Sequence, residues 1–339
     1  MRNILFQPKI REGWHLAKGL LIGIDGGGTH STAVAAWPDG RIAAVAHGGG
    51  LNFHNIGVDA VRQNLEKMVD ALCKKAGAQA EGVCVGMSAL DGPGDEASTA
   101  LFTAGLISPG TLDLQSDAYV ALMGFTLGKP GVIVICGTGS MLVMIDGKGN
   151  QHVSGGWGYL LNDAGSGFTL AREGLLAAID MAEGLGAKTP LLEDAMAFFR
   201  AEAPRGLIDR IYDPACTPDV VAGFARCVIQ RVREGDEVAK SILERNMRRL
   251  AGHASALIDR APEAARVGLY GGIFAHSPEA RKLFGEALAG SHPEAVVGMP
   301  EYPPELGALI HLFVKNGQLT EDILENMKNT YEEYRNEQH

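Results

Sequence analysis

The chain has 339 residues, of which 46% are hydrophobic and 21% are charged, and its formal net charge is -10 at pH 7. This length favours about two domains, each with a core of its own. The acidic balance argues against a nucleic-acid partner, because proteins that bind the phosphate backbone usually present a basic face. The 5 cysteines form no C-x-x-C pair, which favours buried thiols in a reducing compartment over disulfides or a zinc site.

Residues 1–19 form a short N-terminal extension in the sequence pattern. Charges are scattered among its apolar positions, so it lacks the continuous apolar core of a signal peptide. No segment of the chain approaches the roughly 18 apolar residues that a membrane span requires. We therefore expect a cytoplasmic protein with no membrane partner.

The chain then opens with three expected strands and a helix. Apolar runs predict strands over 20–25, 32–37 and 41–47, and Pro38-Asp39-Gly40 predicts the turn between the last two. A helix is expected over 57–77, because apolar residues recur there at helical spacing: Val58, Val61, Leu65, Met68, Val69 and Leu72. The next expected elements are a strand over 81–87, a helix over 94–106, a strand over 111–115 and a helix over 118–128.

The opening pattern starts again at residue 131. Expected strands over 131–136 and 141–146 flank a glycine-threonine turn, as at the start of the chain, which indicates two similarly built lobes. The segment 165–262 is expected to be almost wholly helical, with Thr217-Pro218-Asp219 as a start signal. The remaining expected elements are strands at 151–154, 267–270 and 294–299, and helices from Ser277, over 304–316 and over 320–336.

The glycine-rich loop Asp25-Gly26-Gly27-Gly28-Thr29 raises the question of what it binds. A dinucleotide fingerprint would open a helix, whereas this loop leads into a strand, and the Walker A pattern occurs nowhere in the chain. A tight hairpin remains, whose backbone N–H groups can surround an anion because glycines allow close approach. An ordinary hairpin turn would explain this loop equally well, but the second loop, Cys136-Gly137-Thr138-Gly139-Ser140, favours a polyphosphate held by two hairpins.

Five motifs taken together resemble a known family. The two loops are followed by Gly155-Gly156-Trp157-Gly158, by Asp163 through Gly167 and by Gly271-Gly272. This order resembles N-acetylglucosamine kinases, which belong to the BadF/BadG/BcrA/BcrD-type ATPases of the actin, hexokinase and Hsp70 superfamily. The resemblance covers roughly residues 20–315. It implies an α/β fold of two ribonuclease-H-like lobes, 20–118 and 119–316, with ATP and sugar in an interdomain cleft, and a C-terminal helix within 317–339 that packs back on the first lobe.

The resemblance also implies roles on the ATP side. Asp25 would hold Mg2+ through water, although a turn residue that bonds its own loop is the alternative. The family's phosphate-binding hairpins match Gly26, Gly27, Gly28 and Thr29 in the first loop, and Thr138, Gly139 and Ser140 in the second. The adenosine-side turn of the family matches Gly271 and Gly272.

Asp117 matches the family's catalytic aspartate. It would act as the general base that takes a proton from a sugar hydroxyl. Spacing alone favours a helix N-cap for the same residue, and the two roles are compatible. The sugar contacts of the family match Asn52, Gly156, Trp157 and Asp163, with loop structure as the alternative for Asn52 and simple burial for Trp157. His30 and Ala164 depart from the family pattern, which bears on the identity of the sugar.

These expectations converge on an ATP-dependent sugar kinase. It would use ATP and Mg2+ to phosphorylate the 6-hydroxyl of N-acetylglucosamine or a related amino sugar, and it is expected as a possible homodimer. One alternative is an ATPase that activates a reductase or dehydratase by driving electron transfer, which would require cysteines at a subunit interface. The other is a non-enzymatic sugar sensor, but residues 1–19 are too short to form the DNA-binding domain that such sensors carry.

Overall fold

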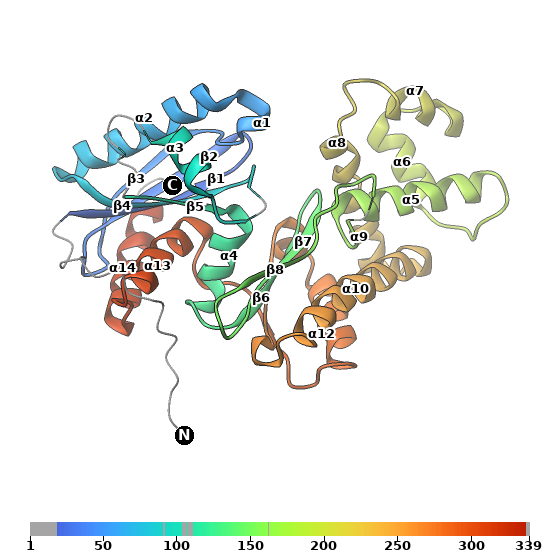
Figure 1. The fold of residues 1–339 in the computed structure, drawn as a ribbon. Coiled ribbons are helices and arrows are strands. Elements are labelled where there is room, and N and C mark those ends of the chain that lie inside the picture. Colours follow the sequence, from blue (N-terminus) through green and yellow to red (C-terminus); the bar gives the residue numbers. More distant parts are fainter. Residues whose placement is uncertain (1–18, 91, 104–106, 108–110, 162, 337–339) are drawn as a thin grey trace. The chain divides into compact units, whose positions relative to one another are not determined.

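The computed structural model describes residues 19–336, except 91, 104–106, 108–110 and 162. The chain forms two compact units (Figure 1). Unit 1 contains the described residues within 1–130, 147–151 and 300–339, and unit 2 contains those within 131–146 and 152–299. The sequence-based lobe limits, 118 and 316, differ from this division. The helices over 117–126 and 304–315 both pack on the sheet of unit 1, so unit 1 extends to residue 130 and resumes at residue 300. The extension 1–18 lies outside the described residues.

Unit 1 is built on a mixed five-stranded sheet of order β3-β2-β1-β4-β5. β1 pairs antiparallel with β2 and parallel with β4, so it is a central strand. Leu20, Leu21, Ile22 and Ile24 of β1 are all buried, as expected for a strand covered on both faces. The strands are β1 (Leu20–Gly26), β2 (His30–Ala36), β3 (Ile42–Gly49), β4 (Ala80–Met87) and β5 (Leu112–Ser116).

Helices cover both faces of this sheet. The expected helix after β3 is confirmed as α2, which packs on β2 and β3 with its apolar residues and ends at Gly77 in the left-handed conformation. α13 packs on β1, β4 and α4, and glycine makes this approach possible, since a Cβ on Gly307 would lie 1.9 Å from the Val120 carbonyl oxygen. The helices are α1 (Phe53–Ile56), α2 (Val58–Ala76), α3 (Glu96–Phe102), α4 (Asp117–Thr126), α13 (Pro304–Lys315) and α14 (Glu321–Asn336).

The C-terminal helix α14 packs along the β2–β3 hairpin of unit 1. Asn326 donates a hydrogen bond to the Asp39 carbonyl at 2.8 Å, and the Tyr334 hydroxyl donates to the Ala43 carbonyl at 2.8 Å. The hairpin turn contributes Gly40, whose φ of 87° lies in the left-handed region and whose missing Cβ makes room for α14. These contacts make α14 an integral layer of unit 1.

Unit 2 repeats the sheet design of unit 1. Its five strands have the order β8-β7-β6-β9-β10, in which β6 pairs antiparallel with β7 and parallel with β9. The first strand of each sheet therefore has an antiparallel hairpin partner on one side and a parallel strand on the other. The two similarly built lobes predicted from the repeated glycine loop are confirmed by this shared order. The strands are β6 (Gly131–Cys136), β7 (Ser140–Ile145), β8 (Gln151–Gly155), β9 (Arg266–Tyr270) and β10 (Val296–Gly298).

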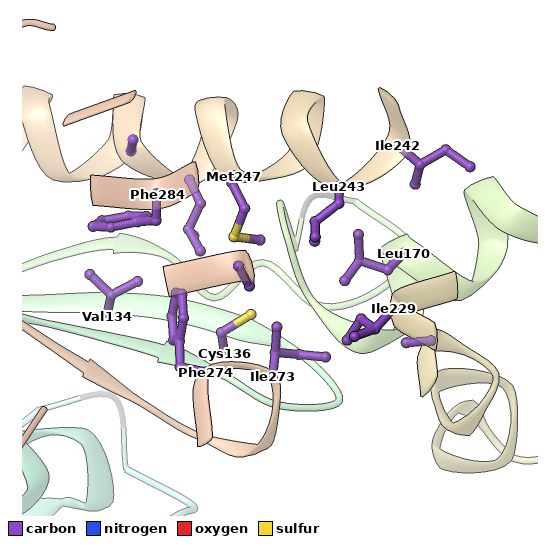
Figure 2. Close-up of a cluster of buried hydrophobic side chains, with 14 of the residues drawn as sticks. Val134, Cys136, Leu170, Ile229, Ile242, Leu243, Met247, Ile273, Phe274 and Phe284 are labelled. Atoms are coloured by element: carbon purple, nitrogen blue, oxygen red, sulfur yellow. The ribbon is translucent and has the colours of Figure 1, made fainter. Parts of the chain in front are cut away.

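A helical subdomain fills the interval between β8 and β9, as expected for 165–262. Its long helix α10 packs on α5, α9 and α12, and Leu243 and Met247 of α10 join Val134 and Cys136 of β6 in one apolar core (Figure 2). The expected helix from Thr217 is interrupted at Phe224, which separates α8 from α9. The helices of unit 2 are α5 (Gly167–Ala182), α6 (Leu191–Phe199), α7 (Leu207–Ile211), α8 (Pro218–Gly223), α9 (Ala225–Arg233), α10 (Glu237–Ile258), α11 (Gly272–His276) and α12 (Pro278–Ala289), with 3-10 turns at Pro204–Gly206 and Pro262–Ala264.

Candidate active site

The first glycine loop is the hairpin turn between β1 and β2. Gly26 ends β1 and His30 begins β2, so the turn consists of Gly27, Gly28 and Thr29. It is closed by a hydrogen bond from the Gly27 N–H to the His30 carbonyl at 3.1 Å. A Cβ on Gly26 would lie 2.7 Å from the Gly86 carbonyl oxygen, so glycine is needed for packing there. Gly28 is half-buried and Thr29 is exposed, which leaves this part of the turn available to an anion.

Two carboxylates, Asp25 and Asp117, lie at the C-terminal ends of parallel strands in unit 1. Asp25 is the penultimate residue of β1, and Asp117 follows the last residue of β5. Burial, together with the charges of Glu305 and Asp117, raises the pKa of Asp25 to about 7. Parallel strands end at the same edge of a sheet, which explains how residues distant in sequence come together there.

Asp117 is the first residue of α4 and not its N-cap. The cap is Ser116, whose side chain accepts a hydrogen bond from the Tyr119 N–H at 3.1 Å. The N-cap assignment that spacing favours for Asp117 is therefore wrong by one residue. Its Oδ1 accepts from the Ala118 N–H at 2.7 Å, and burial raises its pKa although that bond lowers it. Since the cap function belongs to Ser116, Asp117 is available for another role.

Asn52 has a structural role in unit 1. Its Oδ1 accepts a hydrogen bond from the His54 N–H at 3.0 Å and so caps α1, while its Nδ2 lies 3.5 Å from Ser88 Oγ. The preceding Leu51 N–H donates to the Gly27 carbonyl at 2.9 Å, which places this segment against the first glycine turn. The structure thus supports the loop-structure alternative for Asn52, since its Oδ1 caps α1. The side-chain NH2 group of Asn52 remains near the first glycine turn.

The second glycine loop is the hairpin turn between β6 and β7. Gly137, Thr138 and Gly139 separate the two strands, and the Gly137 and Thr138 carbonyls accept hydrogen bonds from the first two N–H groups of α5, at 2.7 and 3.1 Å. Ser140 is buried, and its hydroxyl donates to the Ala164 carbonyl at 2.7 Å. Its side chain is therefore used within the fold, so that Thr138 and Gly139 are the residues of this turn best placed to meet a ligand.

Asp163 lies against this second hairpin. It is 6% exposed, and its Oδ1 accepts from the Gly158 N–H at 3.1 Å. Burial raises its pKa, while hydrogen bonds from the Gly158 and Ser140 backbones lower it. A Cβ on Gly139 would lie 2.8 Å from Asp163 Oδ2, so the carboxylate passes directly beside the turn. The predicted phosphate and sugar residues of unit 2 are thus in contact.

Gly156 and Trp157 follow β8 in the same region. The Gly156 N–H donates to the Ser140 carbonyl at 3.0 Å, and its φ of 73° lies in the left-handed region that favours glycine. Trp157 is 68% exposed, so the simple-burial alternative for this residue is wrong. An exposed indole can stack on the apolar face of a sugar ring. Asn162, at the start of the Asp163 segment, lies outside the described residues.

The Gly271-Gly272 turn joins β9 to α11 beside the second hairpin. Gly271 has a φ of 100°, and a Cβ there would lie 2.5 Å from the Cys136 carbonyl oxygen. Nothing lies within 4 Å of a Cβ built on Gly272. Glycine is therefore required at 271 by the backbone and by β6, whereas Gly272 leaves open space for another molecule.

Comparison with known proteins agrees with this arrangement. A model of the BadF/BadG/BcrA/BcrD ATPase family matches residues 22–311. The chain belongs to this family.

Two curated relatives of this BadF/BadG/BcrA/BcrD family member are sugar kinases. It is 28% identical over 242 residues to an N-acetylmuramic acid/N-acetylglucosamine kinase of Clostridium acetobutylicum, covering 70% of this chain and 79% of the relative. It is 28% identical over 241 residues to an N-acetyl-D-glucosamine kinase of Dictyostelium discoideum, covering 67% of this chain and 76% of the relative. A Chromobacterium violaceum crystal structure, provisionally assigned as an N-acetylglucosamine kinase, has a TM-score of 0.68 at 26% identity and covers 87% of this chain and 99% of that one. The actin-like α/β fold expected from the motifs is confirmed.

The donor set of this family member fits a hydrated magnesium ion. The described residues contain no group of three or more His, Cys, Asp or Glu side chains arranged to hold a metal directly. Among these same residues, no Lys, Arg or His forms an ion pair with Asp25, Asp117 or Glu305. Mg2+ keeps several waters and is commonly bound through one or two carboxylates and the phosphates of a nucleotide. Uncompensated carboxylates on one edge of the sheet suit that mode of binding.

Glu305 is the residue that sequence patterns missed. It lies in the first turn of α13, in the segment Pro303-Pro304-Glu305, where an acidic residue is common for a helix start. Its burial was not evident, because α13 follows the first sheet by almost two hundred residues of chain. A charged residue inside a strongly apolar helix was the available signal, since Asp and Glu are almost never fully buried unless paired.

Two surface cavities of unit 2 lie apart from these residues. One of about 650 Å³ is lined by the end of α5 and by α7, and one of about 540 Å³ is lined by α5 and α10. None of the predicted site residues lines either cavity. Within the described part of the chain, no helix is both long and apolar enough to cross a membrane.

Proposed function

We propose that this chain transfers the γ-phosphate of ATP to the 6-hydroxyl of N-acetylglucosamine or a related amino sugar, with Asp117 as the general base. Its class, an ATP-dependent carbohydrate kinase, follows from its family and from relatives that are amino-sugar kinases. The observation that carries the finer proposal is the state of Asp117, which begins α4, is relieved of capping by Ser116 and has a raised pKa. A carboxylate with a raised pKa is a stronger base.

The reaction requires one proton acceptor and one site of charge stabilisation. Asp117 accepts the proton of the sugar 6-hydroxyl while that oxygen bonds to the γ-phosphorus, and the bond from the γ-phosphorus to the bridging oxygen of ADP breaks. Oδ1 of Asp117 is fixed by the Ala118 N–H, which leaves Oδ2 to face the hydroxyl. The first turn of α4 favours the ionised form of the carboxylate, which is the form a base needs.

The phosphates of ATP are assigned to the backbone of the two glycine turns. In unit 1 the available groups are those of Gly28 and Thr29, and in unit 2 those of Thr138 and Gly139. Asp25 would hold Mg2+ through water, and the metal would supply positive charge to neutralise the phosphoryl group during transfer. Gly272 would leave room for the adenosine side of the nucleotide.

The sugar is assigned to Asp163, Trp157, Gly156 and Asn52. Asp163 Oδ2 can accept hydrogen bonds from sugar hydroxyls while Oδ1 remains fixed by Gly158. The exposed Trp157 ring offers an apolar face to the pyranose. Ala164 is 4% exposed and carries no charge, so Asp163 is the acidic group that this segment offers to the sugar.

The test is ADP release from Mg-ATP with a panel of sugars. The panel consists of N-acetylglucosamine, glucosamine, N-acetylmuramic acid, N-acetylmannosamine and glucose. We expect strong release with one N-acetylated or amino sugar, and none with the 6-deoxy form of that sugar, which should compete with it. Release that does not depend on any sugar would contradict the proposal and favour an ATPase that activates another enzyme.

Two variants test the general base. Asp117→Asn should lower kcat by about 10²–10⁴-fold, because a positioned base contributes about that much, and nucleotide binding should persist. Asp59→Asn is the matched control, since Asp59 also lies in the first turn of a unit 1 helix but is exposed. A loss of less than about tenfold in Asp117→Asn would exclude Asp117 as the base.

A further inference from the structure

Glu305 is a buried carboxylate whose partner is a hydroxyl. It is 7% exposed, and the Tyr331 hydroxyl of α14 donates a hydrogen bond to its Oε1. Among the described residues, no Lys, Arg or His forms an ion pair with it. Removing a carboxylate from water without a compensating cation is costly. A tyrosine donor orients the carboxyl group but supplies no positive charge to it.

The packing of α13 on β1 brings this charge to the metal candidate. A Cβ on Gly23 would lie 2.3 Å from the Glu305 carbonyl oxygen, so the first turn of α13 lies directly on β1. Asp25 follows Gly23 by two residues and therefore faces the same side of the sheet. Two acidic residues, Asp25 of β1 and Glu305 of α13, thus lie on the same face of the sheet.

We propose that Glu305 is the second carboxylate of the Mg2+ site and that Tyr331 is the positioning residue that fixes it. This inference rests on the proposed function, because Mg-ATP is the expected ligand of Asp25. Tyr331 engages Oε1, so Oε2 can accept a hydrogen bond from a water molecule of the hydrated ion. The buried charge of Glu305 then contributes to metal affinity, and α14 supports the site although it lies at the end of the chain.

The experiment measures metal binding directly. Mn2+ is titrated into the full-length protein with a non-hydrolysable ATP analogue and no sugar, and free Mn2+ is followed by electron paramagnetic resonance. Glu305→Gln keeps the shape of the side chain and should weaken Mn2+ binding by about tenfold. Tyr331→Phe removes only the hydroxyl and should weaken Mn2+ binding by about fivefold, as expected for one lost hydrogen bond.

Tyr334→Phe is the matched control. Tyr334 lies on the same helix, but its hydroxyl donates to the Ala43 carbonyl, so its loss should affect α14 without affecting the metal. The affinity for the analogue without metal should be the same in all variants. Unchanged Mn2+ affinity in Glu305→Gln and Tyr331→Phe, or an equal loss in Tyr334→Phe, would overturn the inference and leave a structural role for the Glu305–Tyr331 pair.

The outcomes for the wild type separate this inference from the proposed function. If the wild type binds Mn2+ with the analogue but phosphorylates no sugar, the sugar-kinase proposal fails, while a weaker metal affinity in Glu305→Gln still supports the role of Glu305. If the wild type phosphorylates a sugar but the variants bind Mn2+ normally, the role of Glu305 fails alone. A wild type that binds no Mn2+ with the analogue overturns the inference.

Discussion

Asp113→Asn should destabilise unit 1 in a way that depends on pH. The Asp113 carboxylate accepts hydrogen bonds from Gln115 Nε2 at 2.9 Å, His311 Nε2 at 2.9 Å and Lys315 Nζ at 2.6 Å. His311 Nδ1 also forms a hydrogen bond with the Tyr119 hydroxyl at 2.9 Å. Asparagine has one acceptor oxygen and places an NH2 group where the carboxylate accepts, so at least one donor loses its partner.

The cost can be derived from burial. The side chains of Asp113 and His311 are 14% and 11% exposed, and removing one member of a buried pair costs about 3–5 kcal/mol. Lys315 is 54% exposed and can be solvated, which places the cost near 3 kcal/mol, or a loss of roughly 6–12 °C in Tm for a unit of this size. Thermal unfolding followed by circular dichroism at pH 7 measures this loss.

The pH dependence follows from the pKa of Asp113. Burial raises the pKa of Asp113, but the hydrogen bonds and charges of His311 and Lys315 lower it by more. The net pKa is therefore below the ordinary 3.8. A carboxyl group with a depressed pKa in the folded state stabilises the protein above its unfolded pKa, and this stabilisation is lost as the pH falls towards the folded pKa. The difference between wild type and Asp113→Asn should therefore be constant from pH 7 to 5 and shrink below about pH 4.

A control distinguishes the network from a general charge effect. Asp39 pairs with Arg41 at 2.8 Å, but these side chains are 47% and 62% exposed, so Asp39→Asn should change stability by less than about 1 kcal/mol. A difference between wild type and Asp113→Asn that stays the same at pH 7 and pH 3, or that does not exceed that of the control, would refute the reasoning.

Three further substitutions test packing and ligand contacts. Gly307→Ala should destabilise unit 1 by about 3 kcal/mol or more in urea unfolding, because the new Cβ would lie 1.9 Å from the Val120 carbonyl oxygen and α13 would have to move. Gly271→Ala should lower both Tm and ATP affinity, since its φ of 100° strains any side chain and the Cβ would lie 2.5 Å from the Cys136 carbonyl; unchanged nucleotide binding would argue against the adenosine-side role. Asp163→Asn should raise the KM for the sugar and lower Tm slightly, because one amide oxygen replaces a carboxylate that accepts from both the Gly158 and Ser140 backbones; an unchanged KM would remove Asp163 from the sugar site.

The glycine loops and the strands beside them could be predicted because their signals are local. A run such as Leu20–Ile24 is apolar throughout, and the Asp25–Thr29 loop follows it directly. The same holds for α2, whose apolar spacing is contained in one segment. Local patterns also identified Asp117 at the end of a strand, although the cap was assigned one residue too late, because Ser116 and Asp117 are both good capping residues.

The unit boundary and the buried charges depend on contacts between distant segments. The pattern of α13 shows an apolar helix but not the sheet on which it packs, and glycine at 23 and 307 indicates close approach only once the partner is known. The Glu305–Tyr331 and His311–Asp113 pairs join residues whose partners no local period identifies. Their burial could not be derived from a single sequence.

The two glycine hairpins have the same position in similar sheets but different charges before the turn. Asp25 is separated from the first turn by Gly26, whereas Cys136 directly precedes the second turn, and the Cys136 thiol donates to the Gly165 carbonyl at 3.0 Å. Burial raises the pKa of the Cys136 thiol, so that position is neutral. A neutral residue suits a turn that meets phosphate through backbone N–H groups alone, while a carboxylate beside phosphate requires a cation to offset repulsion. The repeated scaffold therefore favours a metal beside the first hairpin and direct backbone contact at the second, which is the asymmetry that the Mn2+ titration of Glu305→Gln tests.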